Sequence, residues 1–264
     1  MAASKENLWS HRRLALIIGN EKYQSNNKLA YSINNANDLK HSLEKIQFKV
    51  TLYRDVEREM MDIIANFGGE IEDGDLILFY FSGHCYRVNN ENYLLPTHDI
   101  KIQTAEDIPD FGCRTDSALK RLMRNNPSYV TIFILDCSSQ YVLNTGTAVK
   151  RKYNYKCLHQ CTYLLLARAE GKGLSEMQPP PETFIQFACG ANQASTVVLG
   201  ANRNSLFTKH LLQNITEENI IISELFSRVR NAVYQESNHR QIPLSMDGLQ
   251  QYKQVYLNKV IIGK

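Results

Sequence analysis

The sequence predicts an α/β fold built on a parallel sheet, and two observations carry the prediction. Short apolar runs, typical of strands buried on both faces, recur along the first half of the 264-residue chain. Between them lie segments whose apolar residues repeat at helical spacing. Strands joined by helical crossovers form a parallel sheet with helices on both faces. Hydrophobic residues make up 43% of the chain and charged residues 22%, which excludes a disordered or collagen-like protein.

Each element follows from its local pattern. The apolar or alternating runs predict strands at 13–18, 48–53, 76–81, 129–135 and 183–188, with a final short strand at 255–257. Helical spacing predicts helices at 36–46, 60–71, 204–215 and 221–236. Thr115 or Asp116 can cap one more helix, which must end before Pro127. The polar segment 138–182 is predicted to be a long loop.

Charge and hydropathy narrow the class of protein. Thirty basic and 27 acidic residues leave a net charge of +3, too small an excess to indicate a nucleic-acid or polybasic membrane-binding protein. No apolar stretch approaches the ~18 residues that span a bilayer, and the N-terminus shows no secretory signal. We therefore expect a cytoplasmic protein whose six cysteines are thiols rather than a disulfide framework.

Reactive residues follow two of the expected strands. In a parallel sheet, ligands and catalysis collect at the carboxyl ends of the strands. The first strand ends in Gly19–Lys22, which matches neither a dinucleotide fingerprint nor a P-loop and disfavours a nucleotide-binding module. The third strand ends in Ser82–Cys85 and the fourth in Asp136–Ser139. If these strands are neighbours, ~4.8 Å apart, an imidazole lies beside a thiol or hydroxyl, as covalent acyl transfer requires.

These strand ends belong to a wider set of motifs that resembles a known family. The motifs are RLALIIGNEKY, INNANDL, DLILFYFSGH, NYLLP, VTIFILDCS, FIQFACGANQAS and SLFTKHLL. Together they resemble the caspase-like cysteine peptidases (family C14) of the paracaspase and metacaspase group. The resemblance implies a caspase-like fold, a six-stranded, mostly parallel sheet flanked by helices.

The resemblance also implies the domain organisation. After an N-terminal tail, 1–11, a single caspase-like domain is expected over 12–258. Its large-subunit-like part covers about 12–138, the loop covers 139–182, and the small-subunit-like part covers about 183–258.

The resemblance implies that His84 is the catalytic base and that the nucleophile stands two residues after Asp136. That position is Ser138, and a serine hydroxyl is far harder to ionise than a thiol of pKa ~8.5. Cys137 is the alternative nucleophile, but adjacent strand residues face opposite sides, so it should point away from His84 into the packed helix layer. The sequence therefore predicts lost or strongly attenuated activity. Natural degeneration and an introduced substitution both stay open, and Ser139, where relatives often carry Arg, favours the former.

The same resemblance places the substrate-binding groups. The oxyanion hole would use the main-chain N–H groups of Cys85 and Ser138, and the Cys85 side chain is expected to crowd the substrate. Relatives cleave after Arg or Lys, and Asp136 matches one of the carboxylates that receive this side chain. Asn35 replaces a second expected acid, and none stands near Ala194. Asp136 as a mere helix cap or loop anchor stays open.

No cofactor or metal is expected. One group offers three soft ligands where a structural zinc needs four: Cys157, His159 and Cys161. Another group matches no EF-hand spacing and is better interpreted as solvated acids: Glu106, Asp107 and Asp110.

Two functions remain. One is a basic-specific endopeptidase impaired at Ser138. The other is a pseudopeptidase that binds peptides or regulates active homologues. The expected partners are a peptide or protein substrate and a second caspase-like domain, in a homodimer or heterodimer that pairs through 255–257 as an exposed edge. Neither a nucleic acid nor a membrane is expected as a partner.

Overall fold

Six strands form the main sheet. The structure is a computed structural model that describes residues 11–25, 27–127, 129–138, 141–143, 173–190, 203–250 and 253–260. The strand order is β2-β1-β3-β6-β7-β8. The first five are parallel, namely β2 (Lys49–Arg54), β1 (Arg13–Gly19), β3 (Leu76–Val88), β6 (Thr131–Ser138) and β7 (Thr183–Phe187). The last, β8 (Leu244–Asp247), is antiparallel to β7. The prediction of a six-stranded, mostly parallel sheet is confirmed.

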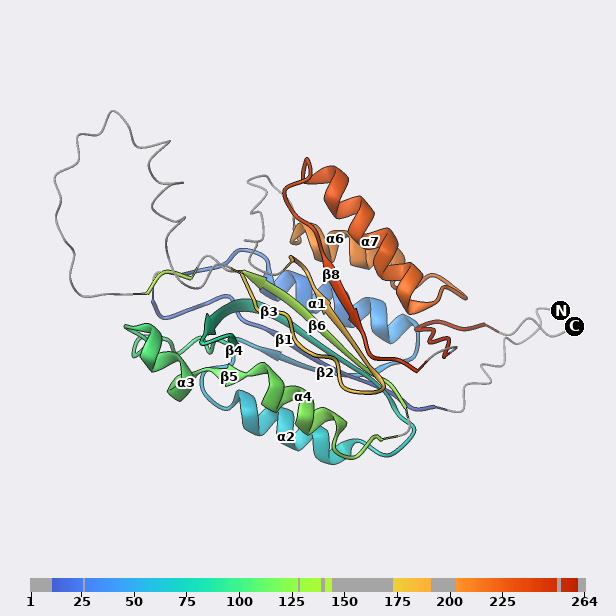
Figure 1. Ribbon diagram of the computed structural model, residues 1–264, viewed down its shortest axis with the longest axis horizontal. Helices are drawn as coiled ribbons and strands as arrows, with labels where there is room; N and C mark the ends of the chain where they lie inside the picture. Colours follow the sequence, from blue (N-terminus) through green and yellow to red (C-terminus); the bar gives the residue numbers. More distant parts are fainter. Residues whose placement is uncertain are drawn as a thin grey trace, which may run out of the picture.

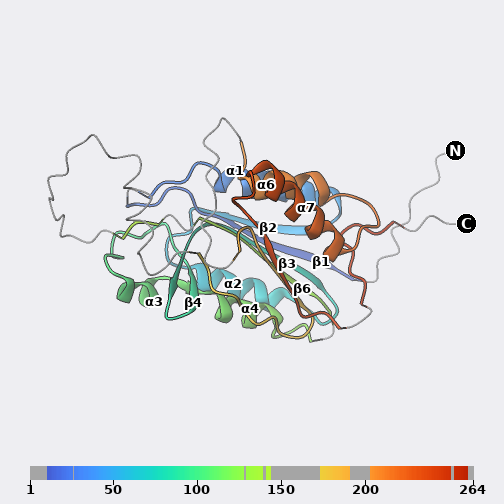
Figure 2. The ribbon, with the colours of Figure 1, turned by 45° about the horizontal axis from the view of Figure 1, so that its top comes forward.

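Helices cover both faces of this sheet (Figures 1 and 2). One face carries α1 (Ser32–Lys45), α6 (Leu206–Asn214) and α7 (Ile222–Glu236). The other carries α2 (Met60–Glu70), α3 (Ile108–Phe111) and α4 (Thr115–Met123), with the 3-10 turn η1 (Ala105–Asp107) before α3. Two short strands, β4 (Glu91–Leu94) and β5 (Cys113–Arg114), extend from β3 outside the main path. The sequence showed no pattern for either of them.

The alternation of side chains divides the core into two layers. Even-numbered residues of β3 and β6, such as Leu78 and Ile132, pack with the apolar residues of α1, α6 and α7. Odd-numbered residues, such as Phe79 and Phe133, pack with those of α2 and α4. Both strands are buried on both faces, which explains their continuous apolar runs. The same alternation decides the side of the sheet on which each residue at the strand ends lies.

The expected final strand at 255–257 is wrong. Val255 and Leu257 are each 1% exposed and belong to the core under α7, and Tyr256 makes one isolated bridge to Ile221. The alternating pattern reflects burial rather than a place in the sheet. The sixth strand is β8, whose side chains are only partly covered, so it lacks the apolar signature of the other strands.

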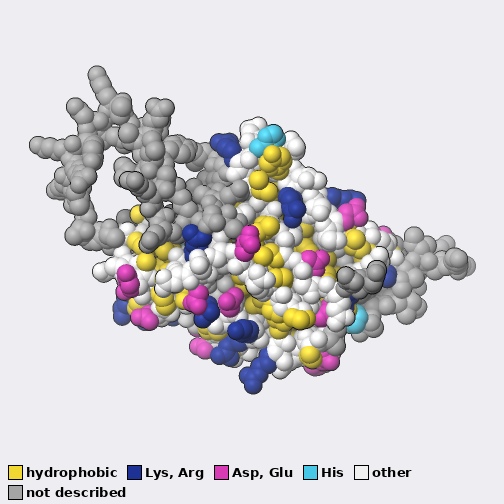
Figure 3. All heavy atoms as spheres, viewed as in Figure 1, with side chains coloured by type: hydrophobic (Ala, Val, Ile, Leu, Met, Phe, Trp, Pro, Cys, Tyr) yellow, Lys and Arg dark blue, Asp and Glu magenta, His cyan; other side chains and the backbone are white. Residues whose placement is uncertain are grey.

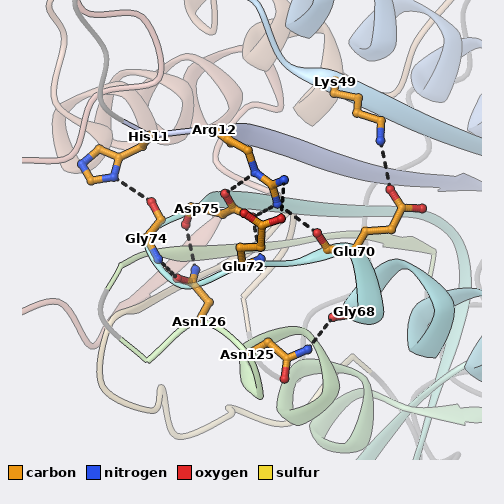
Figure 4. Close-up of polar contacts among 10 residues, drawn as sticks. All are labelled: His11, Arg12, Lys49, Gly68, Glu70, Glu72, Gly74, Asp75, Asn125 and Asn126. Carbon is orange, nitrogen blue, oxygen red and sulfur yellow. Dashed lines mark hydrogen bonds and ion pairs between the residues drawn. The ribbon is translucent and has the colours of Figure 1, made fainter.

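A polar network closes the amino edge of the sheet (Figure 4). The Arg12 guanidinium donates to both carboxylate oxygens of Asp75, at 2.9 and 2.7 Å. Asn126, which is 3% exposed, accepts from the Gly74 N–H at 3.0 Å and donates to the Asp75 carbonyl at 2.7 Å. These bonds join the start of β1, the turn before β3 and the end of α4, and leave the opposite edge for the reactive residues.

The surface agrees with the small net charge. Acidic and basic side chains are interspersed with apolar ones on the face shown in Figure 3. Among the described residues, no helix is both long and apolar enough to cross a membrane.

Candidate active site

The carboxyl ends of β3 and β6 bring the predicted residues together. The two strands are parallel, with His84 opposite Ser138 and Gly83 opposite Cys137. His84 and Ser138 are even-numbered and therefore belong to the side that faces α1 and α6. Cys85 and Cys137 are buried in the other layer, with α2 and α4. The structure thus separates the histidine and serine from the two cysteines across the sheet.

His84 is held in a defined orientation. Its side chain is almost fully buried, and Nε2 lies 2.7 Å from the main-chain carbonyl oxygen of Asn27. Both ring nitrogens face a carbonyl oxygen, which can only accept, and the much shorter contact at Nε2 favours the neutral tautomer with its proton on Nε2. Nδ1 then faces the end of β6, 3.4 Å from the Ser138 carbonyl oxygen. The Tyr23 hydroxyl accepts a hydrogen bond from the His84 N–H at 2.7 Å.

Burial also sets the charge of His84. Desolvation lowers its pKa below the ordinary value of 6.5, and the contacts with the carbonyls of Asn27 and Ser138 oppose the shift only in part. The imidazole is consequently neutral near pH 7, with Nδ1 as an unprotonated acceptor. This is the protonation state that a general base requires.

The loops after β1 and β6 are joined around His84. The Asn27 side chain donates to the Val142 carbonyl and accepts from the Val142 N–H, both at 2.9 Å. Nearby, Asp99 accepts from the Ser25 N–H at 2.8 Å and from the Tyr141 hydroxyl at 2.9 Å. The residue that holds the imidazole is therefore itself fixed to the segment that follows Ser138.

Sequence reasoning missed this part of the site. It set the end of the first strand aside because no phosphate-binding loop was present. The signal was the position of Tyr23 and Asn27, which follow a parallel strand at the same sheet edge as His84. Contacts from Tyr141, whose ring centroid lies 5.3 Å from that of His84, depend on loop conformation and have no sequence pattern.

Asp136 and Asn35, the two residues that the resemblance assigns to substrate binding, lie together. Asp136 Oδ2 accepts from Asn35 Nδ2 at 3.2 Å and from the hydroxyls of Tyr80, Ser205 and Thr208 at 3.1, 2.5 and 2.7 Å. Burial raises the pKa of this carboxyl, and the donated hydrogen bonds from Ser205, Thr208 and Tyr80 oppose the rise. Ser205 is the N-cap of α6, so the carboxyl anchors the start of that helix. The loop-anchor interpretation thus has direct contacts, and the substrate-binding role stays a prediction.

Two expectations about the cysteines are wrong. Cys85 and Cys137 form a disulfide, with Cα atoms 5.6 Å apart, instead of remaining thiols. Their 52-residue separation gave no sign of the pairing, which follows from strand register. The Cys85 side chain lies in the bond on the α2 and α4 side, 2% exposed, and so does not crowd the His84 side. Cys113 and Cys189 are thiols, as expected.

The two groups of possible metal ligands in the sequence lie away from His84 and Ser138 in the chain. Within the described ranges, no three His, Cys, Asp or Glu side chains are grouped to hold a metal ion. Asp107 accepts from the N–H groups of Gln103 and Thr104, at 3.0 and 2.8 Å, and so caps a turn. Several residues named in the sequence analysis lie outside the described residues: Ser139, Cys157, His159, Cys161 and Ala194.

Comparisons with known proteins agree with this geometry. A sequence model of the Caspase domain of peptidase family C14 matches residues 12–254. The chain belongs to the caspase-domain family. Over 125 residues, 47% of the chain, it is 26% identical to the human mucosa-associated lymphoid tissue lymphoma translocation protein 1 and to its homolog from Mus musculus. The match spans only 15% and 14% of the length of these relatives.

A solved caspase shows the same fold. The crystal structure of caspase-1 from Spodoptera frugiperda superposes with a TM-score of 0.57, covering 97% of this chain and 95% of that one, at 14% identity. At this identity the likeness concerns the fold alone. It supports the caspase-like arrangement of a mostly parallel sheet flanked by helices.

Proposed function

We propose that the chain is a caspase-type endopeptidase domain whose hydrolytic activity is lost or strongly attenuated because Ser138 occupies the nucleophile position. The observation that carries the proposal is the pairing of His84 with Ser138 across adjacent parallel strands. Cys137 is in a disulfide in the opposite core layer, and this favours Ser138 as the residue at the nucleophile position. In this scheme Nδ1 of His84 accepts the nucleophile's proton and later delivers it to the leaving amine.

The partner of His84 explains why serine is a poor substitute. When the base takes up a proton, the imidazolium is stabilised at Nε2 by the Asn27 carbonyl, a neutral dipole. Serine peptidases use a buried carboxylate for this purpose, and its negative charge stabilises the cation more strongly. A thiol with pKa ~8.5 needs much less help to ionise. The site is therefore suited to sulfur and leaves a serine hydroxyl mostly protonated and unreactive.

We further infer that the edge binds a peptide whose basic side chain is directed toward Asp136. Asn35, on α1, contacts Asp136 and offers an amide where the family has a second carboxylate. Hydrogen bonds already occupy Oδ2 of Asp136, and burial raises its pKa, so the attraction for a cation is weaker than that of two ionised acids. The preference for Arg or Lys should accordingly be modest and decrease with salt. The main-chain N–H groups of Cys85 and Ser138 would receive the scissile carbonyl oxygen.

The second candidate function is a pseudopeptidase that binds peptides or pairs with an active homologue in a homodimer or heterodimer. The loss of sulfur at the nucleophile position favours it. For both candidate functions we also propose the domain organisation that the resemblance implies. A large-subunit-like part covers about 12–138, a loop covers 139–182, and a small-subunit-like part covers about 183–258. Both candidates share the peptide-binding edge and differ in turnover.

Binding and turnover of the unmodified chain distinguish the outcomes. Peptides ending in Arg should bind more tightly than matched peptides ending in Asp, and Asp136→Asn should remove the difference. Reporter peptides with Arg or Lys before the scissile bond should show little or no cleavage, since loss of a nucleophile costs ~10⁶ in rate. Efficient cleavage would contradict the loss of activity, and equal binding of both peptides would contradict the basic preference.

A further inference from the structure

Three cysteines gather on the side of the sheet opposite His84. Cys85 is on β3, Cys137 is on β6, and Cys189 follows β7 by two residues. A small pocket is lined by all three, together with Leu135, Gly173, Leu174 and Phe187. The Cys85–Cys137 disulfide and the Cys189 thiol thus share one pocket.

Strand register makes Cys137 the middle member. Leu135 is opposite Phe187 in the β6–β7 pair, and the Ala188 N–H donates to the Leu135 carbonyl at 2.9 Å, so pairing continues past the end of β7. Extended two residues beyond Phe187, the last residue of β7, the same register sets Cys137 opposite Cys189. Neighbouring strands are ~4.8 Å apart, within the Cα separation that a disulfide spans. This extended register, together with the pocket that all three cysteines line, favours a cysteine within disulfide reach on each side of Cys137.

We propose that Cys85, Cys137 and Cys189 form a thiol–disulfide exchange site in which the cross-link moves between β3–β6 and β6–β7. The Cys189 thiolate attacks Sγ of Cys137 in line with the existing bond. A Cys137–Cys189 bond forms as the Cys85–Cys137 bond breaks. Cys85 leaves as a thiolate and takes up the proton that Cys189 released. Atoms and electrons balance within the chain, so no oxidant or reductant is consumed.

The environment of the attacking thiol controls the rate of this exchange. Burial raises the pKa of Cys189 to about 12, so only a small fraction is thiolate near neutral pH. Exchange should be slow there and accelerate about tenfold per pH unit between about pH 7 and pH 9, as the thiolate fraction does. Its consequence is local, because Cys85 directly follows His84 and is released from β6 in the exchanged form. This inference does not depend on peptidase activity.

The test traps Cys85. The full chain carrying its disulfide is first incubated without reductant so that exchange can occur, then given a short pulse of N-ethylmaleimide, digested, and examined by mass spectrometry for alkylated Cys85. The reagent does not cleave disulfides, so Cys85 is labelled only after exchange. Cys157→Ser and Cys161→Ser are included in every variant, so that Cys113 and Cys189 are the cysteines left beside the disulfide pair. A rate independent of protein concentration confirms an intramolecular step.

Cys113 supplies a matched control. Burial raises the pKa of its thiol to about 12 as well, but it does not line the pocket. Cys189→Ala should reduce the trapping rate of Cys85 about tenfold or more, whereas Cys113→Ala should leave it unchanged. Equal trapping in both variants, or none in the parent, would overturn the proposal. If Cys189→Ala does not fold, the parent chain still decides: acid quenching after a pH jump must yield a Cys137–Cys189 peptide, and its absence would refute the exchange.

Discussion

At the scale of single residues, the site depends on how His84 is held. One ring nitrogen is bonded to the Asn27 carbonyl and the other faces the strand that ends at Ser138. The opposition of His84 and Ser138 could be predicted from the sequence, because two buried apolar runs ending in reactive residues imply neighbouring parallel strands. The position of Tyr23 and Asn27 after a parallel strand placed them at the right edge of the sheet, but their contacts with His84 depend on a loop whose path no periodic pattern describes.

A titration tests the environment of His84. Its pKa should lie below 6.5, because burial disfavours the charged imidazole. The unfolded chain then binds a proton at higher pH than the folded one, so stability is lost as the pH falls from about 6.5 through the lowered pKa. NMR of the imidazole carbon-bound protons measures the pKa directly. Urea unfolding should show a flatter pH dependence in His84→Asn, and a His84 pKa above 6.5 would contradict the burial argument.

At the scale of elements, the amino edge fixes the strand starts and the carboxyl edge supplies the chemistry. Four of the five parallel strands were predictable because they are buried on both faces, and the fifth, β2, was predictable from its alternating pattern. The sequence misplaced the sixth strand, since β8 is only partly covered and carries no apolar run. The Cys85–Cys137 bond was also missed, because the pairing of two cysteines depends on the register between β3 and β6.

Two adjacent asparagines test the amino edge. Asn126 is buried and bridges Gly74 and Asp75, whereas the exposed Asn125 donates to the Gly68 carbonyl at 3.0 Å (Figure 4). Asn126→Ala leaves two buried main-chain groups without their partner and should lower the free energy of unfolding by ~1–3 kcal/mol. Asn125→Ala should change it less, since Asn125 is exposed and its side chain makes one such bond instead of two. Urea denaturation of both variants measures the difference, and equal losses would contradict the structural role of Asn126.

At the scale of the whole molecule, β8 is one of the two outer strands of the main sheet, and β2 is the other. Strand β8 pairs with β7 on one side, and no described strand pairs with its other side. An outer strand with unpaired main-chain groups is a template for pairing with another chain. The expected site of self-association therefore moves from 255–257, which is buried, to Leu244–Asp247.

A weak dimer follows from that edge. Sedimentation equilibrium at high micromolar concentration should show reversible association. Ser245→Pro is not a suitable probe, because the Ser245 hydroxyl donates to the Gln186 side chain on β7 and its loss would disturb the sheet itself. Asp247→Lys, at an exposed position of β8, should weaken the dimer while leaving the far-UV circular dichroism unchanged. A clean monomer of the unmodified chain at that concentration would contradict the prediction.

The central claim is that the caspase-type site is in place except for one atom, and Ser138→Cys tests it most directly. The change replaces an oxygen by sulfur with little change in volume. It should give measurable cleavage of a reporter peptide after Arg or Lys, which His84→Ala in the same background should abolish, because base and nucleophile act as a unit. Cys137→Ala should leave the restored activity largely intact. The account is contradicted if Ser138→Cys restores no cleavage, or if the unmodified chain cleaves well and Cys137→Ala abolishes that activity.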